Sequence, residues 1–308
     1  MLQLASHLTL FIGLLCTSTA LCQTRVESLT AKGAVFKKDK AGVVTEIRFA
    51  DNSTLTPDDW KEVGKLTTLT RASISRSDSS LLNDETAKAI AGLDQLEHFF
   101  SNGAEVSDEG MKAFANWKKL RHFGFDHWGW REAGKNKSLG AGIAHLAAIP
   151  TLESIRLGGC RVDNSACEGL AKIKQIQSID LFHCYAVTDE GIAKLTSLPK
   201  LKVITLGPQF TPRITDRTLE HLSKVASLEQ INITETWLTY DAGFVFLKKL
   251  PNLKVLNLKF IVADEKDIAK LKADCPKVTI DWTMPDDETT AKTKERFQKA
   301  AMKPVNGK

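Results

Sequence analysis

One stretch of twenty residues recurs along the chain at regular offsets. "VTDEGIAKLTSLPKLKVITL" (187–206) aligns without a gap to "ITDRTLEHLSKVASLEQINI" (214–233), 27 positions later, and to "VSDEGMKAFANWKKLRHFGF" (106–125), 81 positions earlier. The apolar positions match in all three copies, while the polar letters change. Such self-similarity indicates a stack of supersecondary units, none of which can bury its apolar face alone.

The repeat extends well beyond these three copies. Eight pairs of apolar residues spaced LxxL precede presumed strands, and their second members lie 27, 24, 32, 24, 25, 27 and 25 residues apart. These second members are Leu69, Leu96, Leu120, Leu152, Ile176, Leu201, Leu228 and Leu253. A period near 25 leaves room for one strand and one short helix per unit, and is too short for a pair of helices.

Each unit changes its apolar period halfway along. Ile192, Leu195 and Leu198 follow three-residue helical steps, whereas Ile204 and Leu206 alternate as in a strand. Thr188 with Asp189 stands where a helix needs a side-chain oxygen for its free amides, and so do Thr215 with Asp216 and Ser107 with Asp108. The pattern therefore predicts an α/β solenoid, with a curved parallel sheet on the concave side and helices on the convex side.

Two units carry a more specific signature. "LESIRLGGCRV" (152–162) and "IQSIDLFHCYAVTDEGIAKL" (176–195) resemble the cysteine-containing class of leucine-rich repeat. The resemblance implies that Cys160 and Cys184 occupy a turn position where the side chain satisfies backbone amides, with Gln209 and Thr236 in their place in later units. The segment 35–66 is similar to the entry of secreted bacterial repeat proteins of this class.

Composition and patterning divide the chain into four parts. Residues 1–22 lack Lys, Arg, Asp and Glu and contain an apolar run followed by small residues, which predicts a signal peptide and a secreted or periplasmic protein. Residues 23–42 are then the lead-in to an N-terminal cap, and 43–282 the solenoid. Residues 283–308 are polar and predict a disordered tail or a frayed helix.

Charge and motif content argue against several classes of function. A net charge of +5 without a polycation tract argues against nucleic acid as a partner, and outside the leader no stretch is apolar enough to span a membrane. The chain shows no GxSxG, HExxH, phosphate-binding glycine loop or CxxC spacing. We therefore expect a monomeric, non-enzymatic protein without a cofactor.

Strand alternation predicts which side chains face the concave side. The exposed positions lie two, four and six residues after each second LxxL member. From the Leu96 unit onward they include a set of candidate partner-binding residues: His98, Phe100, His122, Asp126, Arg156, Asp180 and Phe182. This polar surface with occasional aromatic rings suits a protein or peptide, or a glycan. Arg156 and Asp180 share a register, which predicts an ion pair across neighbouring strands.

The 32-residue step contains an insertion, 125–138, that places Trp128, Trp130 and Arg131 in a loop at the sheet edge. Trp and Arg dominate interface energetics, so this loop is a candidate contact. The alternative is that one tryptophan folds back over the core, given the area that an indole buries.

The prediction is thus a binding scaffold that uses the concave sheet and the Trp-containing loop. Two alternatives belong to other classes. One is an F-box-type ubiquitin-ligase substrate adaptor, although no F-box-like segment precedes the repeats. The other is a metal-binding or hydrolytic site at His98, His122 and Asp126, against which stands the reading of these residues as a polar ladder facing solvent.

Overall fold

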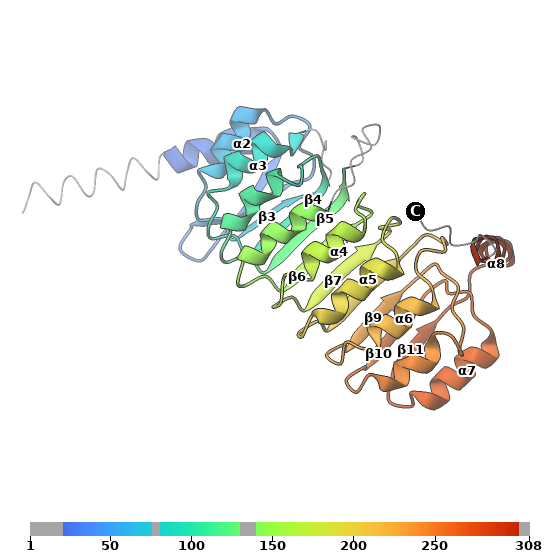
Figure 1. Ribbon diagram of the computed structural model, residues 1–308. Helices are drawn as coiled ribbons and strands as arrows, with labels where there is room; N and C mark the ends of the chain where they lie inside the picture. Colours follow the sequence, from blue (N-terminus) through green and yellow to red (C-terminus); the bar gives the residue numbers. More distant parts are fainter. Residues whose placement is uncertain (1–20, 76–80, 130–139, 302–308) are drawn as a thin grey trace, which may run out of the picture.

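The computed structural model describes residues 21–75, 81–129 and 140–301. Eleven strands form one sheet in which the spatial order follows the sequence from β1 to β11 (Figure 1). β1 and β2 pair antiparallel and all later neighbours are parallel. The strands are β1 (Ala34–Lys38), β2 (Val44–Phe49), β3 (Arg71–Ile74), β4 (His98–Ala104), β5 (His122–Trp128), β6 (Ser154–Gly158), β7 (Ser178–Phe182), β8 (Val203–Gly207), β9 (Gln230–Ile233), β10 (Val255–Leu258) and β11 (Thr279–Trp282).

Short helices connect the strands along one face of the sheet. Residues 21–31 are also helical. The α-helices are α2 (Pro57–Gly64), α3 (Asp84–Ile90), α4 (Asn164–Leu170), α5 (Asp189–Lys194), α6 (Asp216–Leu222), α7 (Glu265–Asp274) and α8 (Asp287–Ala301). Several units use 3-10 turns instead, namely η2 (Gly110–Asn116), η4 (Ala141–Ala148), η5 (Leu195–Ser197) and η6 (Phe244–Lys249).

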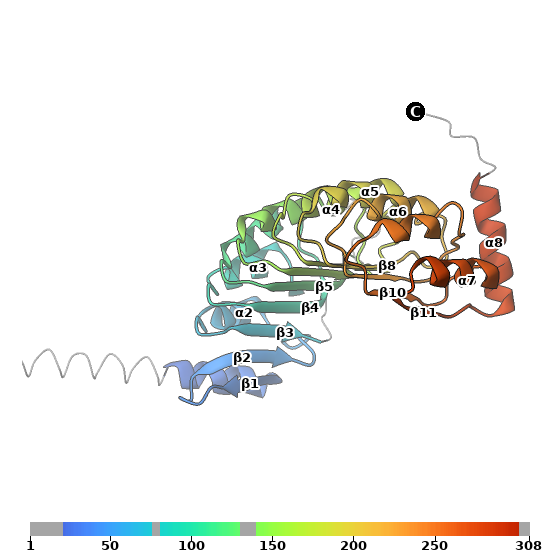
Figure 2. The same cartoon turned by 90° about the horizontal axis from the view of Figure 1, so that it is seen from below.

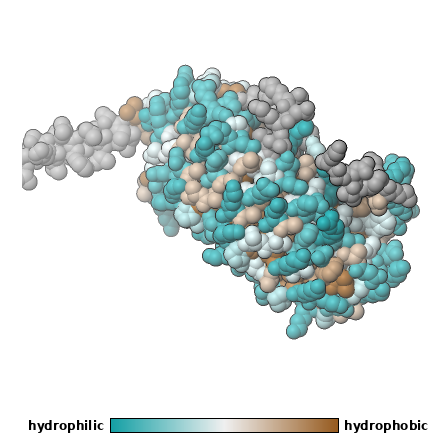
Figure 3. Space-filling model, viewed as in Figure 1, coloured by the Kyte–Doolittle hydropathy of each residue, from teal (hydrophilic) through white to brown (hydrophobic). Residues whose placement is uncertain are grey.

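The sheet bends into an arc with the strands on the inside and the helices on the outside (Figure 2). This arrangement confirms the predicted solenoid. The predicted register is confirmed as well, since His98 pairs with His122, and Arg156 with Asp180, across adjacent parallel strands. The helical side shown in Figure 3 is mostly hydrophilic. Among the described residues, no helix has the length and hydropathy required to cross a bilayer.

The core changes character along the arc. Around β4 and β5 it is aromatic: Phe114 lies 5.7 Å from Phe99 and 4.7 Å from Trp117, measured between ring centroids. From β7 onward the corresponding positions are aliphatic, as in Leu195 and Leu222. Both versions are fully buried, so the same backbone plan accepts either kind of core.

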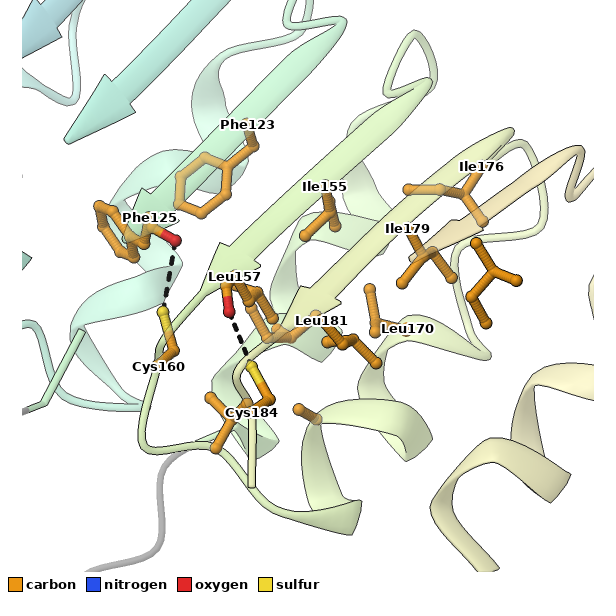
Figure 4. Packing of buried hydrophobic residues seen from close by; sticks show 14 of the residues in the cluster. Phe123, Phe125, Ile155, Leu157, Cys160, Leu170, Ile176, Ile179, Leu181 and Cys184 are labelled. Carbon is orange, nitrogen blue, oxygen red and sulfur yellow. Dashed lines mark hydrogen bonds between the residues drawn. The ribbon is translucent and has the colours of Figure 1, made fainter. Parts of the chain in front are cut away.

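The two cysteines of the repeat lie at the predicted turn, with one difference. Cys160 Sγ donates to the carbonyl of Phe125 at 3.3 Å, and Cys184 Sγ donates to that of Leu157 at 2.7 Å (Figure 4). They satisfy mainly carbonyls of the preceding unit rather than amides, although Cys160 also accepts from the amide of Trp128 at 3.4 Å. Burial raises the pKa of both thiols, which keeps them protonated as donors.

The two residues expected to replace these cysteines in later units differ in their placement. Thr236 is buried, and its hydroxyl donates to the carbonyl of Ile214 at 2.6 Å. Gln209 is exposed and lies in the left-handed region with a φ of 53°, so it does not occupy the turn position.

The aspartates that open the helices mainly tie neighbouring units together. Asp189 accepts from the amide of Thr215 at 2.9 Å and from the hydroxyl of Thr218 at 2.5 Å, both one unit further on. Asp216 binds Thr239 of the next unit in the same way. The predicted cap is present at Thr215, which accepts from the amide of Arg217, whereas Thr188 has no side-chain cap.

A helix packs at the N-terminal end of the sheet. This helix, 21–31, contributes the buried Leu29, and Arg25 pairs with Glu62 of α2 at 2.8 Å. Of the two forms predicted for the C-terminal segment, residues 287–301 adopt the helical one, α8. The Phe297 ring lies 6.0 Å from that of Trp237, and Arg296 Nη1 donates to the carbonyl of Phe210 at 3.5 Å, so α8 lies against the turns that follow β8 and β9.

Candidate functional site

The concave side chains form rows that run across the strands. One row contains Glu46, Arg71, His98, His122, Ser154, Ser178, Val203, Gln230, Val255 and Thr279. Two residues further along each strand, a second row contains Arg48, Ser73, Phe100, Gly124, Arg156, Asp180, Thr205, Asn232, Asn257 and Asp281. Five of the predicted site residues, His98, Phe100, His122, Arg156 and Asp180, therefore lie in two adjacent rows.

His98 and His122 form a stacked pair. Their ring centroids lie 4.3 Å apart with an interplanar angle of 16°, and His122 Nδ1 lies 2.7 Å from the hydroxyl of Ser154. Partial burial lowers the pKa of both imidazoles, and the nearby Arg71 guanidinium lowers the pKa of His98 further. Both rings are therefore neutral at neutral pH in the free protein.

The alternative metal site is not assembled. Asp126 lies four residues beyond His122 on the same strand, a separation of about 13 Å along the backbone. Its carboxylate is instead bound to Arg156, with Nε to Oδ1 at 2.7 Å. No group of three or more His, Cys, Asp or Glu side chains able to hold a metal ion occurs among residues 21–75, 81–129 and 140–301.

Arg156 holds two carboxylates rather than the single one predicted. Besides Asp126, its Nη1 donates to Asp180 Oδ2 at 2.5 Å. The hydrogen bond to Asp126, followed by the charges of both aspartates, raises the pKa of the guanidinium. The three side chains thus form a clip across β5, β6 and β7 in which the arginine charge is fully offset and a net charge of −1 remains.

A hollow of about 250 Å³ lies beside this clip, over β3 to β6. Arg71, Ser73, His98, Phe100, His122, Ser154 and Arg156 provide its polar and aromatic walls. Gly124 lies beneath the Phe100 ring: a Cβ at this position would lie 2.9 Å from Cδ2 of Phe100 and 3.7 Å from Cβ of Arg156. The absence of a side chain therefore lets the Phe100 ring, which is half-buried, pack directly over the β5 backbone, where it lines the hollow.

The later strands carry a different surface. Asn232 Nδ2 donates to the hydroxyl of Thr205 at 2.9 Å, and Asn257 Nδ2 donates to Asn232 Oδ1 at 2.7 Å. Phe182 ends β7 and its ring stacks on that of His183, with 3.7 Å between centroids. His183 Nε2 in turn lies 2.9 Å from Glu235 Oε2. These polar groups satisfy one another across the units.

Trp128 is not a contact residue. It is fully buried at the end of β5, and its indole Nε1 donates to the carbonyl of Val106 at 2.7 Å. Simple alternation would place Trp128 on the concave side with Asp126, but His127 has a φ of 55° and this left-handed residue turns the next side chain inward. Trp130 and Arg131 lie outside the described residues.

Sequence reasoning began its concave rows at β4 and so missed Arg48 and Arg71. Arg71 follows from the same rule, because it lies two residues after Leu69, and Arg48 follows from its alternation with the apolar Ile47 and Phe49 ahead of the first LxxL pair. Ser154 and Gly124 were placed in the rows but were not recognised as walls of a hollow. A glycine at an exposed strand position was the available signal.

Solved structures with a similar fold are leucine-rich repeat proteins. A complex of TLR13 with the RNA ssRNA13 superposes with a TM-score of 0.56 at 16% identity, covering 78% of this chain and 32% of that one. An internalin, InlF of Listeria monocytogenes, gives a TM-score of 0.49 at 15% identity, covering 73% of this chain and 57% of that one. No protein-family model and no curated protein matches the sequence. The chain thus has the leucine-rich repeat fold and spans less than two thirds of either neighbour.

Proposed function

We propose that the chain is a non-enzymatic binding scaffold that recognises a protein or peptide through its concave sheet. The observation that carries this proposal is the division of labour within each unit. The apolar residues and the aspartates that bond each unit to the next (the aspartate ladder) hold the units together, while the residue types of the concave rows vary from strand to strand. A surface whose residues can vary without disturbing the core is suited to recognition.

The chemistry of the rows favours a polypeptide partner. Acidic and basic groups alternate with neutral amides and hydroxyls, and an aromatic ring is accessible. Nucleic acid is held mainly by runs of Lys and Arg against phosphates. TLR13 is seen with RNA, but here the basic stripe is interrupted by the Asp126 and Asp180 carboxylates that clamp Arg156.

Several parts of the proposal extend beyond the concave sheet. Trp130 and Arg131 are proposed as a second contact at the edge of β5. Export to a secreted or periplasmic location and a monomeric state remain predictions from the sequence. The ubiquitin-ligase adaptor alternative also stays a prediction, and no contact in the described part of the chain favours it over a simple scaffold.

Site-specific photocrosslinking tests the proposal. A benzophenone side chain at Ser178, on the concave side, is compared with one at Glu168, which lies on helix α4 and is exposed. We expect a protease-sensitive adduct from a protein extract of the source organism with the Ser178 probe and none with the Glu168 probe. Adducts from Glu168 alone, or adducts removed by nuclease and not by protease, would contradict the proposal.

A further inference from the structure

Positive charge on the concave sheet is concentrated at its N-terminal strands and is not internally neutralised there. Arg48 and Arg71 are exposed, and neither forms an ion pair with any residue in the described ranges. Their acidic neighbour Glu46 is already paired with Lys37 at 3.0 Å. By contrast, Lys259 on the C-terminal strands is bound to Asp281 at 2.5 Å.

The hollow places a cation, two imidazoles and an aromatic ring within reach of one small ligand. Arg71, His98 and His122 occupy the same register on three consecutive strands, and strands are about 4.8 Å apart. The three groups therefore span about 10 Å, a distance that one residue of a bound peptide can bridge. Phe100 lies in the next row, where its ring packs over Gly124 and lines the hollow.

We propose that this hollow binds an acidic peptide segment of the partner, with one Asp or Glu carboxylate between Arg71 and the His98–His122 pair and an adjacent apolar side chain against Phe100. The proposal deepens the proposed function and rests on it. A guanidinium presents two parallel N–H donors to a carboxylate, and the histidine edge supplies a further donor.

A peptide fits this site better than an anionic polysaccharide. A sulfated or uronic acid chain needs a continuous basic track, whereas the unpaired cations end at β3 and the next basic side chain, Arg156, is engaged by two aspartates. An apolar wall beside a single cationic group matches two neighbouring side chains of a peptide. The hollow's volume of about 250 Å³ is also of that size.

The histidine pair couples binding to pH. The charged groups facing it are Arg71 from β3, Glu97 beside β4, Arg121 beside β5 and Glu153 beside β6. Arg121 Nη2 and Glu153 Oε1 pair at 2.8 Å, so their charges largely cancel. Arg71 therefore provides the main electric field at the histidine pair. A bound carboxylate offsets that field and favours an imidazolium, so peptide binding takes up a proton and strengthens as the pH falls.

The test uses two tetrapeptide amides, acetylated Gly-Leu-Glu-Gly and its Gln counterpart, titrated into the chain labelled with ¹³C-histidine. The ring signals of His98 and His122 are assigned with His98→Gln and His122→Gln. We expect the Glu peptide to shift both signals and to bind at least about tenfold more tightly than the Gln peptide. Its affinity should rise about three- to tenfold between pH 7.5 and pH 5.5, above the usual pKa of Glu.

Three variants locate the binding. Arg71→Gln should weaken the Glu peptide at least about fivefold, and Gly124→Val should abolish its binding, because the valine displaces the Phe100 ring that lines the hollow. Lys259→Gln, which removes one charge from the same face next to β10, is the matched control and should bind as the parent chain does. An unchanged circular dichroism spectrum and thermal midpoint of the free variants verify folding, and Arg71→Gln carries the test by itself if Gly124→Val misfolds.

Three results would overturn the assignment. These are equal binding of the Glu and Gln peptides, equal losses from Arg71→Gln and Lys259→Gln, and chondroitin sulfate shifting the same histidines at more than tenfold lower concentration than the peptide. If the peptide fails while the Ser178 crosslink forms, the scaffold function stands and the assignment of the hollow falls. If the crosslink fails as well, both fall.

Discussion

The two halves of the concave sheet share one backbone plan and differ in almost everything attached to it. The N-terminal half (β2 to β6) has an aromatic core, unpaired arginines and a hollow. The C-terminal half (β7 to β11) has a mainly aliphatic core, with Phe244 as a fully buried ring, and a row of amides and hydroxyls that bond to one another. The aspartates that bond each unit to the next, here called the spine, occur in both halves. The spine therefore determines neither the residue types of the core nor those of the concave surface.

This difference suggests a division between recognition and support. Side chains in the C-terminal half use their hydrogen-bonding capacity on each other, as Thr205, Asn232 and Asn257 do. In the N-terminal half, Arg48 and Arg71 hold charge that no described neighbour neutralises. Exposed arginines are solvated and cost the free protein little, and an arginine beside an accessible aromatic ring is the kind of group that dominates binding energy in an interface.

The largest expected effect comes from truncating one buried side chain in each kind of core. Phe114 and Leu222 occupy equivalent positions in their units, and both are fully buried. Phe114→Ala should lower the free energy of unfolding by about 3–5 kcal/mol and Leu222→Ala by about 2–5 kcal/mol, because each leaves a cavity. Urea denaturation followed by circular dichroism measures both losses.

The control for this comparison is Phe114→Leu, which installs the C-terminal residue type in the aromatic half. We expect a loss of about 1–3 kcal/mol, since Phe99, Trp117 and Phe123 are packed against a ring and leave a gap around leucine. A neutral Phe114→Leu would mean that the two cores are interchangeable and that their difference carries no structural information.

The aspartate ladder should be of similar strength in both halves. Asp189 serves the C-terminal half, and Asp108 accepts from the amides of Gly140 and Gly142 at 2.9 and 2.8 Å in the N-terminal half. Each Asp→Ala change leaves polar groups of the next unit without their acceptor, so we expect a loss of about 1–3 kcal/mol in each case. Denaturation midpoints compare them, and a loss confined to one variant would show that the spine is not uniform.

A smaller effect depends on pH. Burial raises the pKa of the Asp216 carboxyl, with opposing hydrogen bonds from Thr239. A raised pKa in the folded state favours folding at low pH, and this contribution is lost as the pH rises through the folded-state pKa. The wild type should therefore gain stability relative to Asp216→Asn on acidification from pH 7 to pH 4. Asp281→Asn, about half exposed, is the control and should show a smaller change.

Much of this fold can be predicted from the sequence, because the same apolar pattern recurs in eight units. The LxxL pairs and strand alternation fix which side chains face the concave side, and this placed His98, Phe100 and Arg156 correctly. The rule fails where one residue breaks the alternation. His127 adopts a left-handed conformation, and Trp128 is consequently buried in the core instead of exposed at the edge.

Features that depend on long-range contacts could not be predicted from the sequence. Helix α8 places Phe297 beside Trp237, sixty residues away, and bonds Arg296 to the carbonyl of Phe210, and its own composition gives no sign of these partners. The hollow likewise depends on Gly124, which gives the Phe100 ring room to pack over the β5 backbone. Periodicity predicts where side chains point but not what space they leave between them.

The smallest expected effect lies at the boundary between the halves. Arg156 links Asp126 and Asp180, but 46% of its side chain is exposed, so solvent screens the attraction. Arg156→Met should cost about 1 kcal/mol or less, and the cost should shrink as salt weakens the repulsion between the two aspartates left behind. Thermal denaturation at low and high ionic strength measures this. A loss of several kcal/mol that salt does not reduce would place Arg156 in the spine, and the two halves would then be one continuous structural unit.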